Sequence, residues 1–146
     1  MMIEKQYLSH SPEETMKIGR QFGEGLPEGS VVTFFGDLAA GKTTFIKGLV
    51  SGTAHIDPYA VQSPTFTYLH IYEGEKKVYH FDLYRLKDAD EFLSMGFDDY
   101  FGIDGICCVE WSERIEKLLP SHIYQVMMCH GGGDRRHIRI VHPMGL

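Results

Sequence analysis

Residues 30–43 read SVVTFFGDLAAGKT, and this stretch decides the expected fold. Its first six residues are mostly β-branched or aromatic, which is typical of a short buried strand. The residues from Gly36 to Thr43 then match the pattern G-x-x-x-x-G-K-[ST] without a gap. Apolar residues recur at helical spacing from Thr43 to a stop near Gly52. A strand, a glycine-rich turn and a helix in this order predict a phosphate-binding loop.

The residue types in this loop explain how it would hold a nucleotide. Its glycines allow backbone conformations that point several N–H groups at one phosphate group. The helix that follows adds the positive end of its dipole. Lys42 would supply a movable positive charge for the β- and γ-phosphates, and Thr43 would offer a hydroxyl to Mg²⁺. We therefore expect a nucleoside triphosphate to bind here together with magnesium.

Such a site also needs a carboxylate near the metal, usually at the end of a neighbouring strand. Glu110 follows the apolar run 106–109, which predicts an interior parallel strand, and Asp82 ends a strand predicted over 76–82. Thr65 lies in the loop after the helix, where nucleotide switches often place a hydroxyl on Mg²⁺ or the γ-phosphate. Each residue could instead cap or form a turn. Given the loop motif, we expect both carboxylates to be functional.

The remaining pattern predicts a single α/β domain over residues 1–146. Helices are expected after the N-caps Ser11, Asp88 and Ser112. Further strands are expected at 65–72, 76–82 and 105–110, followed by a hairpin of 123–129 and 137–141. Because strands alternate with helices before the terminal strands, we expect a three-layer sandwich with a central mixed sheet, as in P-loop NTPases.

Composition and charge exclude several other classes of protein. The chain is 43% hydrophobic and 23% charged, and no apolar stretch approaches the roughly 20 residues of a membrane helix or resembles a signal peptide. Its net charge of −6 disfavours unaided tight binding to nucleic acid. Cys107, Cys108 and Cys129 have no C-x-x-C spacing, so we expect buried thiols without disulfides in a reducing cytoplasm.

Other kinds of nucleotide or metal site are less well supported. A GTPase would read guanine with N-K-x-D, but the chain contains no asparagine and no T-K-x-D, and the D-x-x-G match at 99–102 is expected to be a loop. A small-molecule kinase would need an arginine-bearing lid, for which Arg135 and Arg136 are the evident candidates. His80 and Asp82 share a strand face, but no third ligand is evident for a transition metal. A kinase and a nucleotide-dependent scaffold stay open beside an ATPase.

Several blocks in a fixed order carry a more specific signal than the loop alone. They are GDLAAGKTTF at 36–45, SPTFT at 63–67, HFDLYRL at 80–86, Glu91 with Gly96, and Glu110 with Trp111. Over nearly its whole length the chain resembles the bacterial TsaE-type P-loop ATPases of tRNA threonylcarbamoyladenosine biosynthesis. The resemblance implies a cytoplasmic ATPase that uses ATP and Mg²⁺. It also implies TsaD-type and TsaB-type partner proteins, which transfer a threonylcarbamoyl group to an anticodon-loop adenine, so that tRNA is contacted only indirectly.

The resemblance further implies a role for each matching residue. Lys42 would hold phosphates, Thr43 and Glu110 would bind magnesium, and Asp82 and Thr65 would position the metal or the attacking water. The residues implied to contact ATP are Gly36, Asp37, Leu38, Ala39, Ala40, Gly41, Lys42, Thr43, Thr44 and Trp111.

Two positions depart from the family pattern. Ala39 stands where a glycine is usual, and it would cost about 1 kcal/mol or more if that residue needs a positive φ. Ser112 stands where a proline is usual, and this change looks neutral because serine is a good N-cap.

Overall fold

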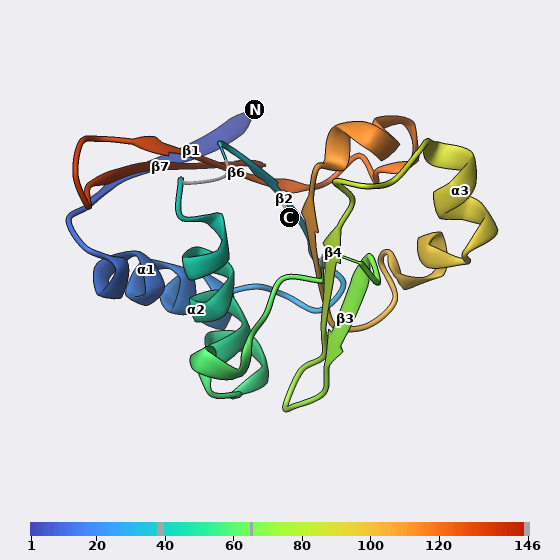
Figure 1. Ribbon diagram of the computed structural model, residues 1–146, viewed down its shortest axis with the longest axis horizontal. Helices are drawn as coiled ribbons and strands as arrows, with labels where there is room; N and C mark the ends of the chain where they lie inside the picture. Colours follow the sequence, from blue (N-terminus) through green and yellow to red (C-terminus); the bar gives the residue numbers. More distant parts are fainter. Residues whose placement is uncertain (38–39, 65, 145–146) are drawn as a thin grey trace.

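The computed structural model describes residues 1–37, 40–64 and 66–144 (Figure 1). Short 3₁₀ helices are labelled η. The elements are β1 (Met2–Ser9), α1 (Pro12–Glu24), β2 (Val31–Phe35), α2 (Lys42–Ala54), η1 (Pro58–Ala60), β3 (Leu69–Tyr72), β4 (Val78–Asp82), α3 (Ala89–Ser94), η2 (Phe97–Tyr100), β5 (Ile106–Glu110), η3 (Ser112–Leu118), β6 (Tyr124–His130) and β7 (Arg136–Pro143).

The strands of the described residues form a seven-stranded sheet in the order β1-β7-β6-β2-β5-β4-β3. Its centre is parallel, because β2 pairs in parallel with both β5 and β6, and β5 pairs in parallel with β4. The outer pairs β1–β7, β6–β7 and β3–β4 are antiparallel. The expected mixed sheet is therefore confirmed, with β2 and β5 in its interior.

Helical layers cover both faces of this sheet, as Figure 1 shows with α1 and α2 on one side and α3 on the other. The strands alternate accordingly: Val32 of β2 and Cys108 of β5 are buried in the cluster that α1 and α2 cover. Val31 and Val109 are buried in the opposite cluster, beneath α3, η2 and η3. The three-layer arrangement predicted from the order of elements is confirmed.

The two helices α1 and α2 cross at two pairs of glycines spaced four residues apart, Gly19 with Gly23 and Gly48 with Gly52. A Cβ atom on Gly19 would overlap the carbonyl oxygen of Phe45. The glycines of α2 are equally close to the backbone of α1. Because the missing side chains let the backbones touch, this crossing holds α2 in place under the sheet.

Several local predictions are confirmed and others are wrong. The Ser11 side chain accepts a hydrogen bond from the backbone N–H of Glu14 at 3.1 Å, as expected of an N-cap. Asp88 caps α3 in the same way, accepting from the N–H of Glu91 at 2.9 Å. The helix expected after Ser112 is instead the 3₁₀ helix η3, in which Ser112 is the first residue and not its N-cap.

Four further features differ from expectation. Strand β1 was not predicted, because most of its side chains are exposed and it is held by its pairing with β7. The strand predicted over 65–72 begins only at Leu69, and part of the D-x-x-G segment lies in η2 rather than in a loop. Cys107 and Cys108 are buried as expected, whereas Cys129 near the end of β6 is exposed. Within the described ranges, no helix has the length and apolar character to cross a membrane.

Candidate functional site

The predicted site residues meet at the edge of the sheet where its central parallel strands end. Glu110 ends β5 and lies in register with Phe34 of β2, just before the loop that starts at Gly36. On the other side, Glu110 lies in register with Asp82, which ends β4. Ligands of parallel α/β sheets bind at this edge, beyond the carboxyl ends of the strands. The strand order thus places both predicted carboxylates beside the predicted phosphate-binding loop.

The described part of that loop contains two glycines with positive φ, one at each end. Gly36 has a φ of 144°, and a Cβ atom on it would overlap the carbonyl oxygen of Met128. Gly41 has a φ of 97° and occupies the N-cap position of α2 without a side-chain cap. The backbone N–H of Ala40 donates to the carbonyl of Asp37 at 2.9 Å. Because both glycines have positive φ, the chain can turn sharply into α2 and leave its first N–H groups for a ligand.

Three predicted residues cannot be placed in this arrangement. Leu38, Ala39 and Thr65 lie outside the described residues, so their roles stay predictions, as does the effect of alanine at position 39. Thr43 is exposed in the first turn of α2, and Thr44 is half-buried beside it.

Lys42, the first residue of α2, carries an unusual buried charge. Its residue is only 5% exposed, and its Nζ atom lies 5.4 Å from the centroid of the Trp111 ring. None of the ion pairs among the described residues includes Lys42. A buried ammonium group without an anion is costly, and a contact with an aromatic face offsets only part of that cost. The surroundings of Lys42 therefore fit a bound anion such as a phosphate group.

The backbone conformation of Trp111 and a ring contact with Tyr84 position its side chain. It has a φ of 60°, which turns the chain abruptly at the end of β5. The Trp111 and Tyr84 ring centroids lie 5.0 Å apart, and Arg114 Nη2 donates to the Tyr84 carbonyl at 3.0 Å. Trp111 is half-buried and also packs against the cluster under α3. The structure thus places Trp111 beside Lys42 and in contact with the core.

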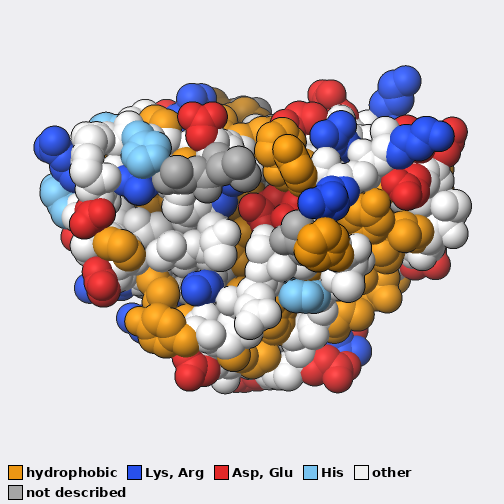
Figure 2. Space-filling view, in the orientation of Figure 1, with side chains coloured by type: hydrophobic (Ala, Val, Ile, Leu, Met, Phe, Trp, Pro, Cys, Tyr) orange, Lys and Arg blue, Asp and Glu red, His pale blue; other side chains and the backbone are white. Residues whose placement is uncertain are grey.

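Asp82 and Glu110 form a pair of neighbouring carboxylates at the ends of β4 and β5, on the side of the sheet edge where the loop begins. The backbone N–H of Tyr84 donates to Asp82 Oδ1 at 3.1 Å, and Ser63 Oγ donates to Oδ2 at 3.3 Å. Burial, and then the charge of Glu110, raise the pKa of Asp82. Figure 2 shows acidic side chains recessed near the middle of one face, with hydrophobic and basic side chains around them.

This donor set fits magnesium better than a transition metal. Mg²⁺ is commonly held by one or two carboxylates together with phosphate oxygens and water. A cation between Asp82 and Glu110 would also relieve the repulsion that raises the pKa of Asp82. Across the described ranges no group of three or more His, Cys, Asp or Glu side chains could hold a metal ion. A magnesium ion completed by phosphate needs no such group.

Sequence reasoning missed the direct partner of Glu110. His80, in the middle of β4, is fully buried, and its Nε2 atom lies 2.8 Å from Glu110 Oε2. The sequence did place His80 on the same strand face as Asp82. It could not show that the next strand in the sheet would be β5, which brings Glu110 within reach.

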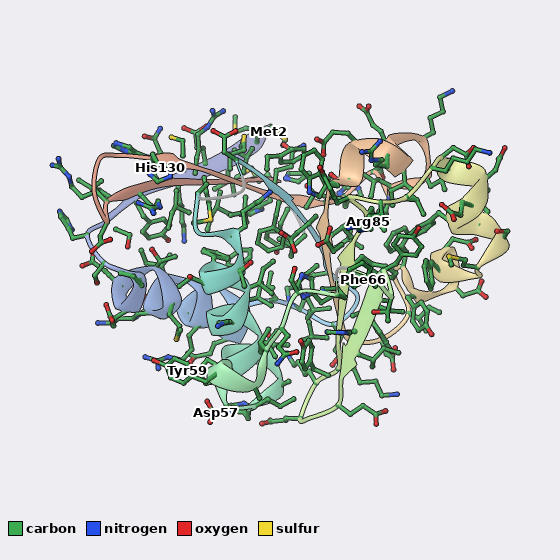
Figure 3. All side chains as sticks on the ribbon, in the orientation of Figure 1. Met2, Asp57, Tyr59, Phe66, Arg85 and His130 are labelled. Carbon is green, nitrogen blue, oxygen red and sulfur yellow. The ribbon has the colours of Figure 1, made fainter. Side chains whose placement is uncertain are left out.

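Two arginines beside the site were also missed or only partly recognised. Arg136, at the start of β7, has its Nε atom 3.7 Å from the position a Cβ on Gly41 would occupy. Its Nη1 atom donates to the carbonyls of Gly133 and Arg135, each at 2.8 Å. Arg85 stacks over the ring of Phe66, 4.8 Å from its centroid, and Figure 3 shows the two side chains next to each other. Arg136 therefore lies beside the loop, and Arg85 lies three residues beyond Asp82 against Phe66.

Comparison with known proteins decides the family. Residues 9–138 match the family model described as "Threonylcarbamoyl adenosine biosynthesis protein TsaE". The chain belongs to the TsaE family. The TsaE protein of Bacillus subtilis is 42% identical over 129 residues, which cover 88% of this chain and 79% of that protein. The TsaE protein of Treponema pallidum is 39% identical over 133 residues, or 91% of this chain and 97% of that protein.

A solved structure extends the TsaE resemblance to the fold. The crystal structure of Bacillus subtilis YdiB matches with a TM-score of 0.78 and 34% sequence identity, over 97% of this chain and 87% of that chain. The family expected from the sequence motifs and the P-loop α/β fold are both confirmed. Both TsaE relatives are named as tRNA threonylcarbamoyladenosine biosynthesis proteins.

Proposed function

We propose that this chain is a magnesium-dependent ATPase subunit of a protein complex that forms threonylcarbamoyladenosine in the tRNA anticodon loop. Two observations together carry the proposal. Lys42, which begins the helix after the loop, is buried beside Trp111 without an ion-pair partner among the described residues. Asp82 and Glu110 end neighbouring strands at the same edge of the sheet. A cationic group for phosphate and two anionic groups for a metal are the complementary halves of a nucleotide–magnesium site. The pathway named for the family supplies the biological setting.

Each residue would act on its own part of the bound nucleotide. The backbone from Gly36 to Gly41 and the start of α2 would bind phosphate oxygens. Lys42 would hold the transferred group, and Thr43 with Glu110 would bind the metal, which when bound neutralises charge on the phosphate oxygens. Asp82, which accepts a hydrogen bond from the N–H of Tyr84, would position the metal or the attacking water. Half-buried Trp111 would keep bulk water from Lys42.

Charge supports a division of labour between this chain and its partners. Its net charge of −6 opposes direct association with a polyanion such as tRNA. We therefore propose that TsaD-type and TsaB-type proteins hold the RNA and perform the transfer, while this chain binds ATP and those proteins.

The central test compares ATP turnover by the wild type and two lysine variants. Lys42→Ala should abolish magnesium-dependent hydrolysis, whereas Lys47→Ala, a half-buried lysine further along the same helix, should leave it near the wild-type rate. Turnover is measured for the chain alone and with the two purified partner proteins. Equal hydrolysis by both variants would contradict the assignment of the loop.

A second measurement separates the ATPase from a kinase or a scaffold. The complex is assembled with ATP or with a non-hydrolysable analogue, and formation of threonylcarbamoyladenosine is followed in tRNA. We expect assembly in both cases and sustained product only with ATP. Sustained product with the analogue would leave only a scaffold role, and phosphorylation of a metabolite would favour a kinase.

A further inference from the structure

His80 is a buried polar residue in a row of apolar ones. On the same face of β4 and β5 lie Val78, Ile106 and Cys108, all fully buried, and Cys108 is in register with His80. A histidine in such surroundings loses its hydration and must recover hydrogen bonds from the protein. The partner it has is Glu110, whose Oε2 atom lies 2.8 Å from His80 Nε2.

We propose that His80 is a positioning residue, whose Nε2–H bond to Glu110 orients that carboxylate for the magnesium–nucleotide. The inference rests on the proposed function and deepens it, because it names the group that acts on the metal-binding carboxylate from behind. Carboxylates that ligate a metal are in turn hydrogen-bonded by outer-shell groups, and loss of such a group typically lowers metal affinity about 10- to 100-fold.

The proposed role of Glu110 sets the direction of this hydrogen bond. A carboxylate that binds a cation can only accept, so this role places the hydrogen on Nε2 of His80. Within the described residues, the Nδ1 atom of His80 has no hydrogen-bond partner, although it is buried. The ring therefore places its N–H where Glu110 requires it and leaves its other nitrogen unsatisfied. An apolar side chain at this position would avoid that cost, but it would leave Glu110 without this donor.

The bond engages one of the two carboxylate oxygens of Glu110. Oε2 accepts from His80, and no hydrogen bond to Oε1 is formed by the residues that the structure describes. With Oε2 held, rotation of the carboxylate is restricted, and Oε1 keeps a defined direction at the end of β5. Glu110 is 5% exposed, so water contributes little to holding it. A pre-oriented oxygen binds a cation with less loss of side-chain freedom.

The test uses two substitutions of His80 that differ in hydrogen bonding. His80→Phe keeps a flat ring but removes the donor, whereas His80→Gln retains an amide N–H that can reach the same carboxylate. The readout is the Mg²⁺ concentration at half-maximal binding of a fluorescent ATP analogue, without turnover. We expect His80→Phe to raise this concentration about 10- to 100-fold, and His80→Gln to stay within about 3-fold of the wild type.

A double-mutant comparison tests whether the effect of His80→Phe on the Mg²⁺ requirement depends on Glu110. In a Glu110→Gln variant, the additional change His80→Phe should alter the Mg²⁺ requirement less than about 2-fold, because non-additivity marks residues that act together. Nucleotide affinity in excess EDTA should be the same for the wild type and His80→Phe. If His80→Phe lowers only the melting temperature and leaves the Mg²⁺ requirement unchanged, His80 is merely structural and the inference is overturned.

A spectroscopic readout remains if His80→Phe fails to fold. In ¹⁵N-labelled wild-type protein, the His80 ring should show a slowly exchanging proton on Nε2, and Glu110→Gln should shift its signal. A proton on Nδ1 instead would overturn the inference whether or not nucleotide binds. Absence of magnesium-dependent binding by the wild type would overturn the proposed function itself, and the two failures are thereby distinguishable.

Discussion

Asp82 and Glu110 lie directly opposite each other at the ends of two neighbouring parallel strands, β4 and β5. Burial, and then the charge of Glu110, raise the pKa of Asp82. An arrangement that would suit a bound cation therefore lowers the stability of the protein when no cation is present.

Asp82→Asn should therefore stabilise the ligand-free chain at neutral pH. A carboxyl group whose pKa is raised by folding favours its protonated form, so the ionised form destabilises the native state above that pKa. Because Asp82 is only half-buried, solvent screening keeps the effect small, and we expect a melting temperature about 2 °C higher. The gain should shrink as the pH falls through the raised pKa, since the wild type is then neutral as well. Thermal unfolding of both proteins between pH 4 and pH 8 measures this. A gain that grows toward low pH would contradict it.

The chain's single tryptophan should report nucleotide binding, because Lys42 lies against its ring. We expect Trp111 emission to change when ATP and Mg²⁺ are titrated into the wild type. Lys42→Met should weaken ATP binding at least about tenfold, as expected for the loss of a charge-assisted contact to phosphate. Lys47→Met serves as the control and should titrate like the wild type. An unaltered affinity in Lys42→Met would place the phosphates elsewhere.

The glycine contact between α1 and α2 should be sensitive to a single methyl group. Gly48→Ala places a Cβ atom onto the carbonyl oxygen of Met16 and should lower the free energy of unfolding by about 1–3 kcal/mol. Gly25→Ala is the matched control, because the Cβ atom there would lie 3.8 Å from its nearest neighbour, the carbonyl of Phe22. Urea denaturation of the two variants should separate them clearly. Equal stabilities would mean that the helices can move apart without cost.

The three cysteines should divide into one reactive and two protected thiols. Cys129 is exposed, whereas burial raises the pKa of Cys107 to about 12 and that of Cys108 well above its ordinary value. A thiol reagent should therefore modify one equivalent in the native chain and three after denaturation. Cys129→Ser should remove the native reaction. Rapid labelling of Cys107 or Cys108 in that variant would show that β5 opens to solvent.

Much of the fold follows from local patterns in the chain. The glycine, lysine and threonine spacing from Gly36 to Thr43 lies in one continuous segment, so its geometry depends on neighbouring residues. The apolar run before Glu110 correctly indicated an interior strand. Strand β1 escaped prediction because its mostly exposed residues carry no strong pattern, and its partner β7 lies at the other end of the chain.

The sequence by itself therefore determined the loop motif at 36–43, the three-layer α/β fold and the family, because each depends on residues close together or on motifs in a fixed order. Only the tertiary structure decided that His80 bonds to Glu110, that Lys42 faces Trp111 and that Arg136 lies beside Gly41. These contacts join strands, helices and turns that are remote along the chain. The order of strands in the sheet sets them, and spacing along the sequence does not specify that order.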